Sequence, residues 1–123
     1  GLLLPATAMG LLSTAVLNLN NMRDVEGDGR AGKRTLVVIM GPSMARVYHL
    51  LLIIGAPLAL TGYTLLNYRG PGQFIFLITL PVLLLHLKVV FSTKEPSALD
   101  PQLKRLALTT FATVIIFGFG MII

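Results

Sequence analysis

Residues 20–35 read NNMRDVEGDGRAGKRT and lie between two long apolar runs. This stretch carries three of the five acidic residues of the chain and four of its ten basic residues. A hydrophobic protein that gathers charge beside an apolar span generally uses that charge. Because the carboxylates come first and the cations follow, the stretch suits a divalent metal that holds a phosphate ester.

The composition around this stretch is that of a membrane protein. The chain is 54% hydrophobic and only 12% charged, whereas charged residues make up about 25% of ordinary soluble domains. The absence of cysteine excludes disulfides and thiolate metal sites. The net charge of +5 comes from cations in loops between apolar runs, which is the pattern of the positive-inside rule. We therefore expect a lipid bilayer, and no nucleic acid, as partner.

Four apolar segments have nearly the length of about 20 residues that spans a bilayer. They are residues 1–19, 44–66, 73–91 and 101–123. Ser43 is the expected N-cap of the second segment, and Asp100, followed by Pro101, that of the fourth. Pro57 and Pro81 fall inside spans, where we expect kinks. The predicted fold class is all-α, a polytopic transmembrane helix bundle.

Charge asymmetry predicts the orientation of the spans. The loops after the first and third segments are basic, whereas the short loop between the second and third carries only Arg69. The two basic loops are therefore expected on the cytoplasmic side of the plasma membrane. The chain opens with Gly1 and enters an apolar run at once, so we expect it to be a piece of a longer polypeptide.

Asn20, Asp24 and Asp28 follow one another at intervals of four residues. On a helix this spacing places the three side chains along one face. Mg²⁺ prefers oxygen ligands and usually takes one or two carboxylates together with substrate phosphates. Gly27 and Gly29 are expected to break the helix, so that Asp28 lies at the opening of a loop.

The cations that follow suit phosphate oxygens, Lys33 as a point charge and Arg34 through a bidentate fork. Thr35 fits equally a hydrogen bond to phosphate and a cap for the next element. A P-loop is excluded because Arg34 stands where that motif requires Ser or Thr. The plainer alternative is a solvated loop whose charges only pair and set topology.

Polar residues elsewhere have structural interpretations. Asn18 lies within a span and is expected to pack or to hydrogen-bond between helices. His49 and His86 are expected at the membrane interface rather than in catalysis. Gly118 and Gly120 are expected to allow close helix packing.

The pattern Asn-Asn-x-Arg-Asp-x-x-x-Asp-x-x-x-Gly-Lys-Arg-Thr-Leu, residues 20–36, resembles the second aspartate-rich motif of the UbiA superfamily of membrane prenyltransferases. Within the superfamily it is most similar to the members that prenylate 1,4-dihydroxy-2-naphthoate in menaquinone synthesis. Further agreement lies in Leu4-Pro5-Ala6-Thr7-Ala8, Val37-Val38, Gly41 and Arg46-x-Tyr48-His49. The resemblance covers the first half of the chain well and the second half in hydropathy and helix count.

The resemblance implies a fold of about nine membrane helices around a cavity, in which two aspartate-rich motifs bind an isoprenoid diphosphate through Mg²⁺. Residues 1–123 are then the C-terminal four-helix part of one integral-membrane domain, with a cytoplasmic motif and loop at 20–43. The remaining N-terminal helices carry the first motif and are a further expected partner.

The resemblance also assigns roles. Asp24 and Asp28 are the expected catalytic residues, and with Asn20 they are the expected Mg²⁺ ligands. The diphosphate is expected to contact Asn20, Asn21, Arg23, Lys33, Arg34 and Thr35, with Arg23 facing either the diphosphate or the acceptor's carboxylate.

The implied reaction joins a polyprenyl group from polyprenyl diphosphate to 1,4-dihydroxy-2-naphthoate, giving demethylmenaquinone. One alternative is the same chemistry on another acceptor, such as 4-hydroxybenzoate, homogentisate or chlorophyllide. Another is a non-enzymatic membrane protein, a transporter or structural subunit, whose basic loop binds anionic lipid.

Overall fold

A computed structural model describes all of residues 1–123, and every regular element in it is helical. The α-helices are α1 (Leu3–Arg23), α2 (Val25–Arg30), α3 (Leu36–Met40), α4 (Pro42–Leu66), α5 (Leu80–Ser92) and α6 (Asp100–Ile122), and the 3-10 helices are η1 (Pro71–Thr79) and η2 (Pro96–Leu99). The predicted all-α fold is confirmed.

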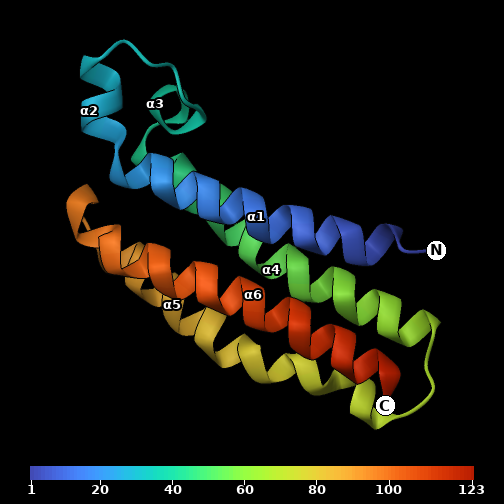
Figure 1. Cartoon of the computed structure of the whole chain (residues 1–123). Helices are drawn as coiled ribbons and strands as arrows, with labels where there is room; N and C mark the ends of the chain where they lie inside the picture. The colour runs from blue at the N-terminus through green and yellow to red at the C-terminus, as the bar shows by residue number, and fades with distance from the viewer.

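Four long helical segments run side by side (Figure 1). They are Leu3–Arg23, Pro42–Leu66, Pro71–Ser92 and Pro96–Ile122, and each is long and apolar enough to cross a membrane. The short helices α2, α3 and η2 lie at one end, and both termini lie at the other (Figure 1). The two basic loops therefore share one end of the bundle, as the charge pattern predicts.

Small side chains line the contact between α1 and α4. Ala8 and Ala15 on α1, and Ala45 and Ala56 on α4, are completely buried, and small residues let membrane helices approach closely. Leucine, isoleucine and phenylalanine side chains cover much of the outer surface, which is the surface that a membrane protein turns to lipid or to further helices.

The helix starts differ from those predicted. α4 begins at Pro42 after Gly41, whose φ of +86° favours glycine, so the prediction of Ser43 as N-cap is wrong. α6 begins at Asp100 itself, and its N-cap is Leu99. The Asp100 carboxylate makes no capping bond because it bonds elsewhere, as described below.

The third span is not one continuous α-helix. It starts as the 3-10 helix η1 and becomes α5 at Leu80. Pro81 is therefore in the first turn of α5, where a missing N–H costs nothing, and the kink expected there stays a prediction. Pro57 lies inside α4, as predicted.

Burial corrects the interpretation of both histidines. His49 is fully buried and His86 is 5% exposed, so the prediction that they lie at the membrane interface is wrong. Asn18 donates to the Ala45 carbonyl oxygen of α4 at 3.3 Å, which confirms an interhelical hydrogen bond. Gly120 packs closely against η1, as predicted, whereas a Cβ at Gly118 would meet nothing within 4 Å, so the close packing expected at Gly118 is wrong.

Candidate functional site

The charged motif begins where α1 ends. Asp24 has φ −95° and ψ 7° and separates α1 from α2. Its N–H donates to the Asn20 carbonyl, and its own carbonyl accepts from the Asp28 N–H at 2.8 Å. Gly27 and Gly29 lie inside α2, so the helix breaks earlier than predicted. Asp28 therefore lies within α2, and the expectation that it opens a loop is wrong.

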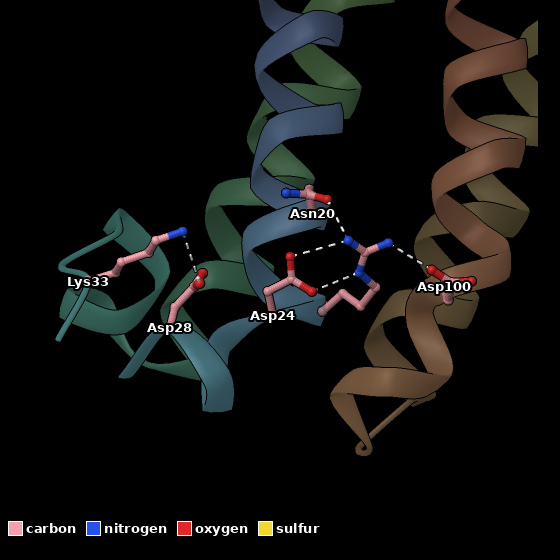
Figure 2. A network of polar contacts seen from close by, with 6 residues as sticks. Asn20, Asp24, Asp28, Lys33 and Asp100 are labelled. Atoms are coloured by element: carbon pink, nitrogen blue, oxygen red, sulfur yellow. Dashed lines mark hydrogen bonds and ion pairs between the residues drawn. The ribbon is translucent and has the colours of Figure 1, made fainter. Parts of the chain in front are cut away.

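The Arg23 guanidinium is the centre of the site. It is the unlabelled side chain in Figure 2, joined by dashed lines to the labelled Asn20, Asp24 and Asp100. It donates to the Asn20 side-chain oxygen at 2.8 Å and to the two Asp24 carboxylate oxygens at 2.9 and 3.2 Å. Its third nitrogen, Nη1, donates to Asp100 Oδ1 at 2.7 Å. Three oxygens of the predicted metal site therefore converge on one cation.

The same contact acts on the Asp24 carboxyl group. The hydrogen bond from Arg23 holds the pKa of Asp24 below its ordinary value. Asp24 is thus ionised at neutral pH and accepts hydrogen bonds or metal coordination through both oxygens.

Asp28 turns away from this cluster toward Lys33 (Figure 2). Its Oδ1 lies 3.9 Å from Lys33 Nζ, a long ion pair with the lysine side chain 70% exposed. Asp24 and Asp28 nevertheless line one open cleft of about 350 Å³, which Arg23, Arg30 and Glu95 also line. No three acidic or histidine side chains gather closely enough to hold a metal by themselves.

The other predicted residues neither line this cleft nor join the Arg23 cluster. Thr35 caps α3, because its hydroxyl oxygen accepts from the Val38 N–H at 3.3 Å; the capping interpretation is confirmed, and the phosphate contact stays a prediction. Arg34 is exposed, Asn21 is half-buried, and neither side chain makes a hydrogen bond. Both are free to contact a ligand, and their roles also stay predictions.

Sequence reasoning missed two acidic residues. Asp100 completes the Arg23 cluster from 77 positions away, and the sequence pattern predicted it only as a helix cap. Glu95 lines the cleft from the loop before η2. Nothing in the spacing pairs these residues with the motif, because the contact depends on how α6 packs beside α1.

The donor set fits Mg²⁺ provided that a substrate supplies the remaining ligands. Asn20 and Asp24 offer three oxygens that already meet at one positive charge. Mg²⁺ commonly binds one or two carboxylates and completes its shell with phosphate oxygens and water. For these oxygens to bind a metal, Arg23 would have to leave them, and its bond to Asp100 Oδ1 does not involve them.

Comparison with known proteins identifies the family of the chain. The UbiA prenyltransferase family model matches residues 1–109. The chain is 36% identical over 122 residues to a Haemophilus influenzae protein named 1,4-dihydroxy-2-naphthoate octaprenyltransferase, covering 99% of the chain and 40% of that protein. It is 39% identical over 120 residues to the Escherichia coli protein of the same name, covering 98% of the chain and 39% of that protein.

A third relative is a chicken (Gallus gallus) protein named UbiA prenyltransferase domain-containing protein 1, 41% identical over 51 residues, which are 42% of the chain and 15% of that protein. No solved structure matches the chain. The chain spans about two fifths of the length of the two bacterial relatives. Since the family model covers most of its residues and its apolar helices are long enough to cross a membrane, the chain is part of a multi-pass membrane protein and belongs to the UbiA prenyltransferase family.

Proposed function

We propose that this chain is the C-terminal four-helix part of a Mg²⁺-dependent membrane prenyltransferase. The full-length protein transfers a polyprenyl group from polyprenyl diphosphate to 1,4-dihydroxy-2-naphthoate. The observation that carries the proposal is the convergence of Asn20 and both Asp24 oxygens on one cation at the end of a membrane helix. The names of the two bacterial relatives support the choice of 1,4-dihydroxy-2-naphthoate as acceptor.

The remaining helices of the protein supply the first aspartate-rich motif and close the cavity over this one. The loop at 20–43 faces the cytoplasm of a cell whose plasma membrane holds the protein. The clustering of both basic loops at one end of the bundle supports this orientation (Figure 1).

Asp24 and Asn20 would hold Mg²⁺, which when bound would supply positive charge to the leaving diphosphate. Asp28 lines the same cleft and is a second carboxylate for a metal–diphosphate complex. Lys33 and Arg34 contribute positive charge from the exposed loop after α2, and Arg23 reaches either the diphosphate or the acceptor's carboxylate. These charges stabilise the diphosphate where its negative charge develops.

The transfer itself breaks the allylic C–O bond, and its electron pair leaves with the diphosphate. An electron-rich ring carbon of the naphthoate then forms the new C–C bond to the allylic carbon. The ring regains its aromaticity when the bond to the carboxyl group breaks and CO₂ departs. Apolar helix faces keep water from the allylic cation, which water would otherwise trap.

The acceptor is tested in membranes that contain the full-length protein. Labelled polyprenyl diphosphate and Mg²⁺ are supplied with 1,4-dihydroxy-2-naphthoate, 4-hydroxybenzoate or homogentisate in separate reactions. Product from the naphthoate alone, lost on adding EDTA, is the expected result. Product from another acceptor would support prenyltransferase activity but overturn the assignment of the naphthoate as acceptor. Transfer that resists EDTA would overturn the proposed Mg²⁺ dependence.

A further inference from the structure

A continuous chain of side-chain hydrogen bonds crosses the bundle through all four long segments. Asn18 on α1 contacts His49 on α4 at 3.3 Å. His49 contacts His86 on α5 at 2.8 Å between their Nε2 atoms, and His86 Nδ1 contacts Gln102 Oε1 on α6 at 3.1 Å. All four side chains are at least nine-tenths buried.

The direction of every bond in this chain is fixed from one end. The Ala45 carbonyl oxygen only accepts, so the Asn18 atom that contacts it is the amide nitrogen. That nitrogen also meets His49 Nδ1, which must accept. His49 Nε2 therefore carries the proton and donates to His86 Nε2. His86 Nδ1 in turn donates to the Gln102 side-chain oxygen.

This chain of hydrogen bonds holds α1, α4, α5 and α6 in one register. All four side chains lie inside the bundle, and a buried polar group left without a partner is costly. Sliding one helix by a residue would separate several donors from their acceptors at once. The four helices are therefore fixed relative to one another at this level of the bundle.

Both ends of the hydrogen-bond chain lie beside the Arg23 cluster in the sequence. Asn18 precedes Asn20 by two residues, and Gln102 follows Asp100 by two. At 1.5 Å per helical residue, each end lies only about 3 Å along its helix axis from a residue that Arg23 contacts. The hydrogen-bond chain thus fixes the position of α1 relative to α6 immediately next to the contact that Arg23 of α1 makes with Asp100 of α6.

We infer that the hydrogen-bond chain Asn18–His49–His86–Gln102 is a positioning unit for the diphosphate site. It aligns the end of α1 with the start of α6, so that Asn20, Asp24 and Asp100 meet around one cation. This inference rests on the proposed function, because the site it aligns is the proposed metal–diphosphate site.

The test uses substitutions in the full-length protein that keep or break the chain. His86→Gln keeps one acceptor and one donor, so the order of bonds survives. His86→Leu removes both, and Gln102→Leu removes only the last acceptor, which is the milder break. Thr113→Val is the matched control, because it breaks the buried Thr113–Thr79 hydrogen bond of 3.1 Å between α6 and η1, which lies deeper in the bundle and away from the site.

Two measurements are made on each variant. The first is the dependence of prenyl transfer on diphosphate and Mg²⁺ concentration. The second is independent of activity: spin labels at exposed Leu17 on α1 and exposed Lys104 on α6 report the distance between these helices in a cysteine-free background. If the wild type transfers no prenyl group, the proposed function fails while the distance measurement still tests the alignment.

His86→Leu and Gln102→Leu are expected to broaden or displace the distance distribution. They are also expected to lower kcat/KM for the diphosphate by roughly tenfold or more, because a small misplacement of a reacting site is costly. His86→Gln is expected to restore both readouts, and Thr113→Val to change only thermal stability. Equal effects of His86→Leu and Thr113→Val, or no rescue by His86→Gln, would overturn the inference.

Discussion

Gly120 is a sharp test of how α6 packs against the third span. A Cβ at this position would lie 3.0 Å from Ile75 Cγ2, 3.2 Å from the Gly72 carbonyl oxygen and 3.4 Å from the Gln73 carbonyl oxygen. The Ile75 contact comes from a branched side chain, and the other two come from backbone. The backbone there is held, because the Gln73 side chain accepts from the Arg69 N–H at 2.6 Å.

Gly118 provides the matched control, because a Cβ there would meet nothing within 4 Å. Replacing a helical glycine by alanine gains about 1 kcal/mol of helix propensity. Gly118→Ala is expected to keep this gain. Gly120→Ala gains the same amount but forces α6 away from η1, and such overpacking costs about 1–3 kcal/mol.

The free energy of unfolding of Gly120→Ala should therefore lie below that of Gly118→Ala by about 1–3 kcal/mol. The assay is equilibrium unfolding of the full-length protein in mixed micelles of rising denaturing-detergent fraction. Two variants that unfold within about 0.5 kcal/mol of each other, the ordinary range for harmless substitutions, would refute the close approach of α6 to η1.

Three further predictions concern the site itself. Arg23→Gln removes the cation that occupies the Asn20 and Asp24 oxygens, so Mn²⁺, followed by electron paramagnetic resonance without diphosphate, should bind more tightly than in the wild type; weaker or equal binding would contradict the arrangement. Thr35→Ala should destabilise the first turn of α3 by about 1 kcal/mol, seen as faster amide hydrogen exchange there, while Thr35→Ser should not. Asp28→Asn should lower prenyl transfer less than Asp24→Asn, because Asp28 lies outside the Arg23 cluster; the reverse order would show that Asp28 is the main ligand.

Hydropathy was sufficient to predict the bundle but not how its helices begin. Four apolar runs of spanning length leave few folds other than a membrane bundle, and the charges set which loops share an end. Helix starts depend on local choices that composition does not settle. Asp100 has a residue type that caps helices, yet its carboxylate bonds Arg23 across the bundle instead.

The candidate site was predictable only in its local part. The spacing of Asn20 and Asp24 brings their oxygens together because both lie near the end of one helix. The position of Asp28 was not predictable, because the helix breaks at Asp24 rather than at the glycines. The buried role of His49 depends on His86, 37 positions away, and a single sequence carries no signal for that contact.

We propose that Asp24 holds a metal–diphosphate complex and does not merely add charge to a loop. Glu26 lies two residues away and lines the same cleft without bonding Arg23. Glu26→Gln therefore removes the same charge from the same loop. A loop that only binds anionic lipid or sets topology would respond equally to both changes.

The most direct measurement is prenyl transfer to 1,4-dihydroxy-2-naphthoate by the full-length protein, compared among wild type, Asp24→Asn and Glu26→Gln across a range of Mg²⁺ concentrations. We expect Asp24→Asn to abolish transfer or to require far more Mg²⁺, and Glu26→Gln to stay close to wild type. Equal activity of the two variants, in membranes where both are shown to be folded, would contradict the proposal.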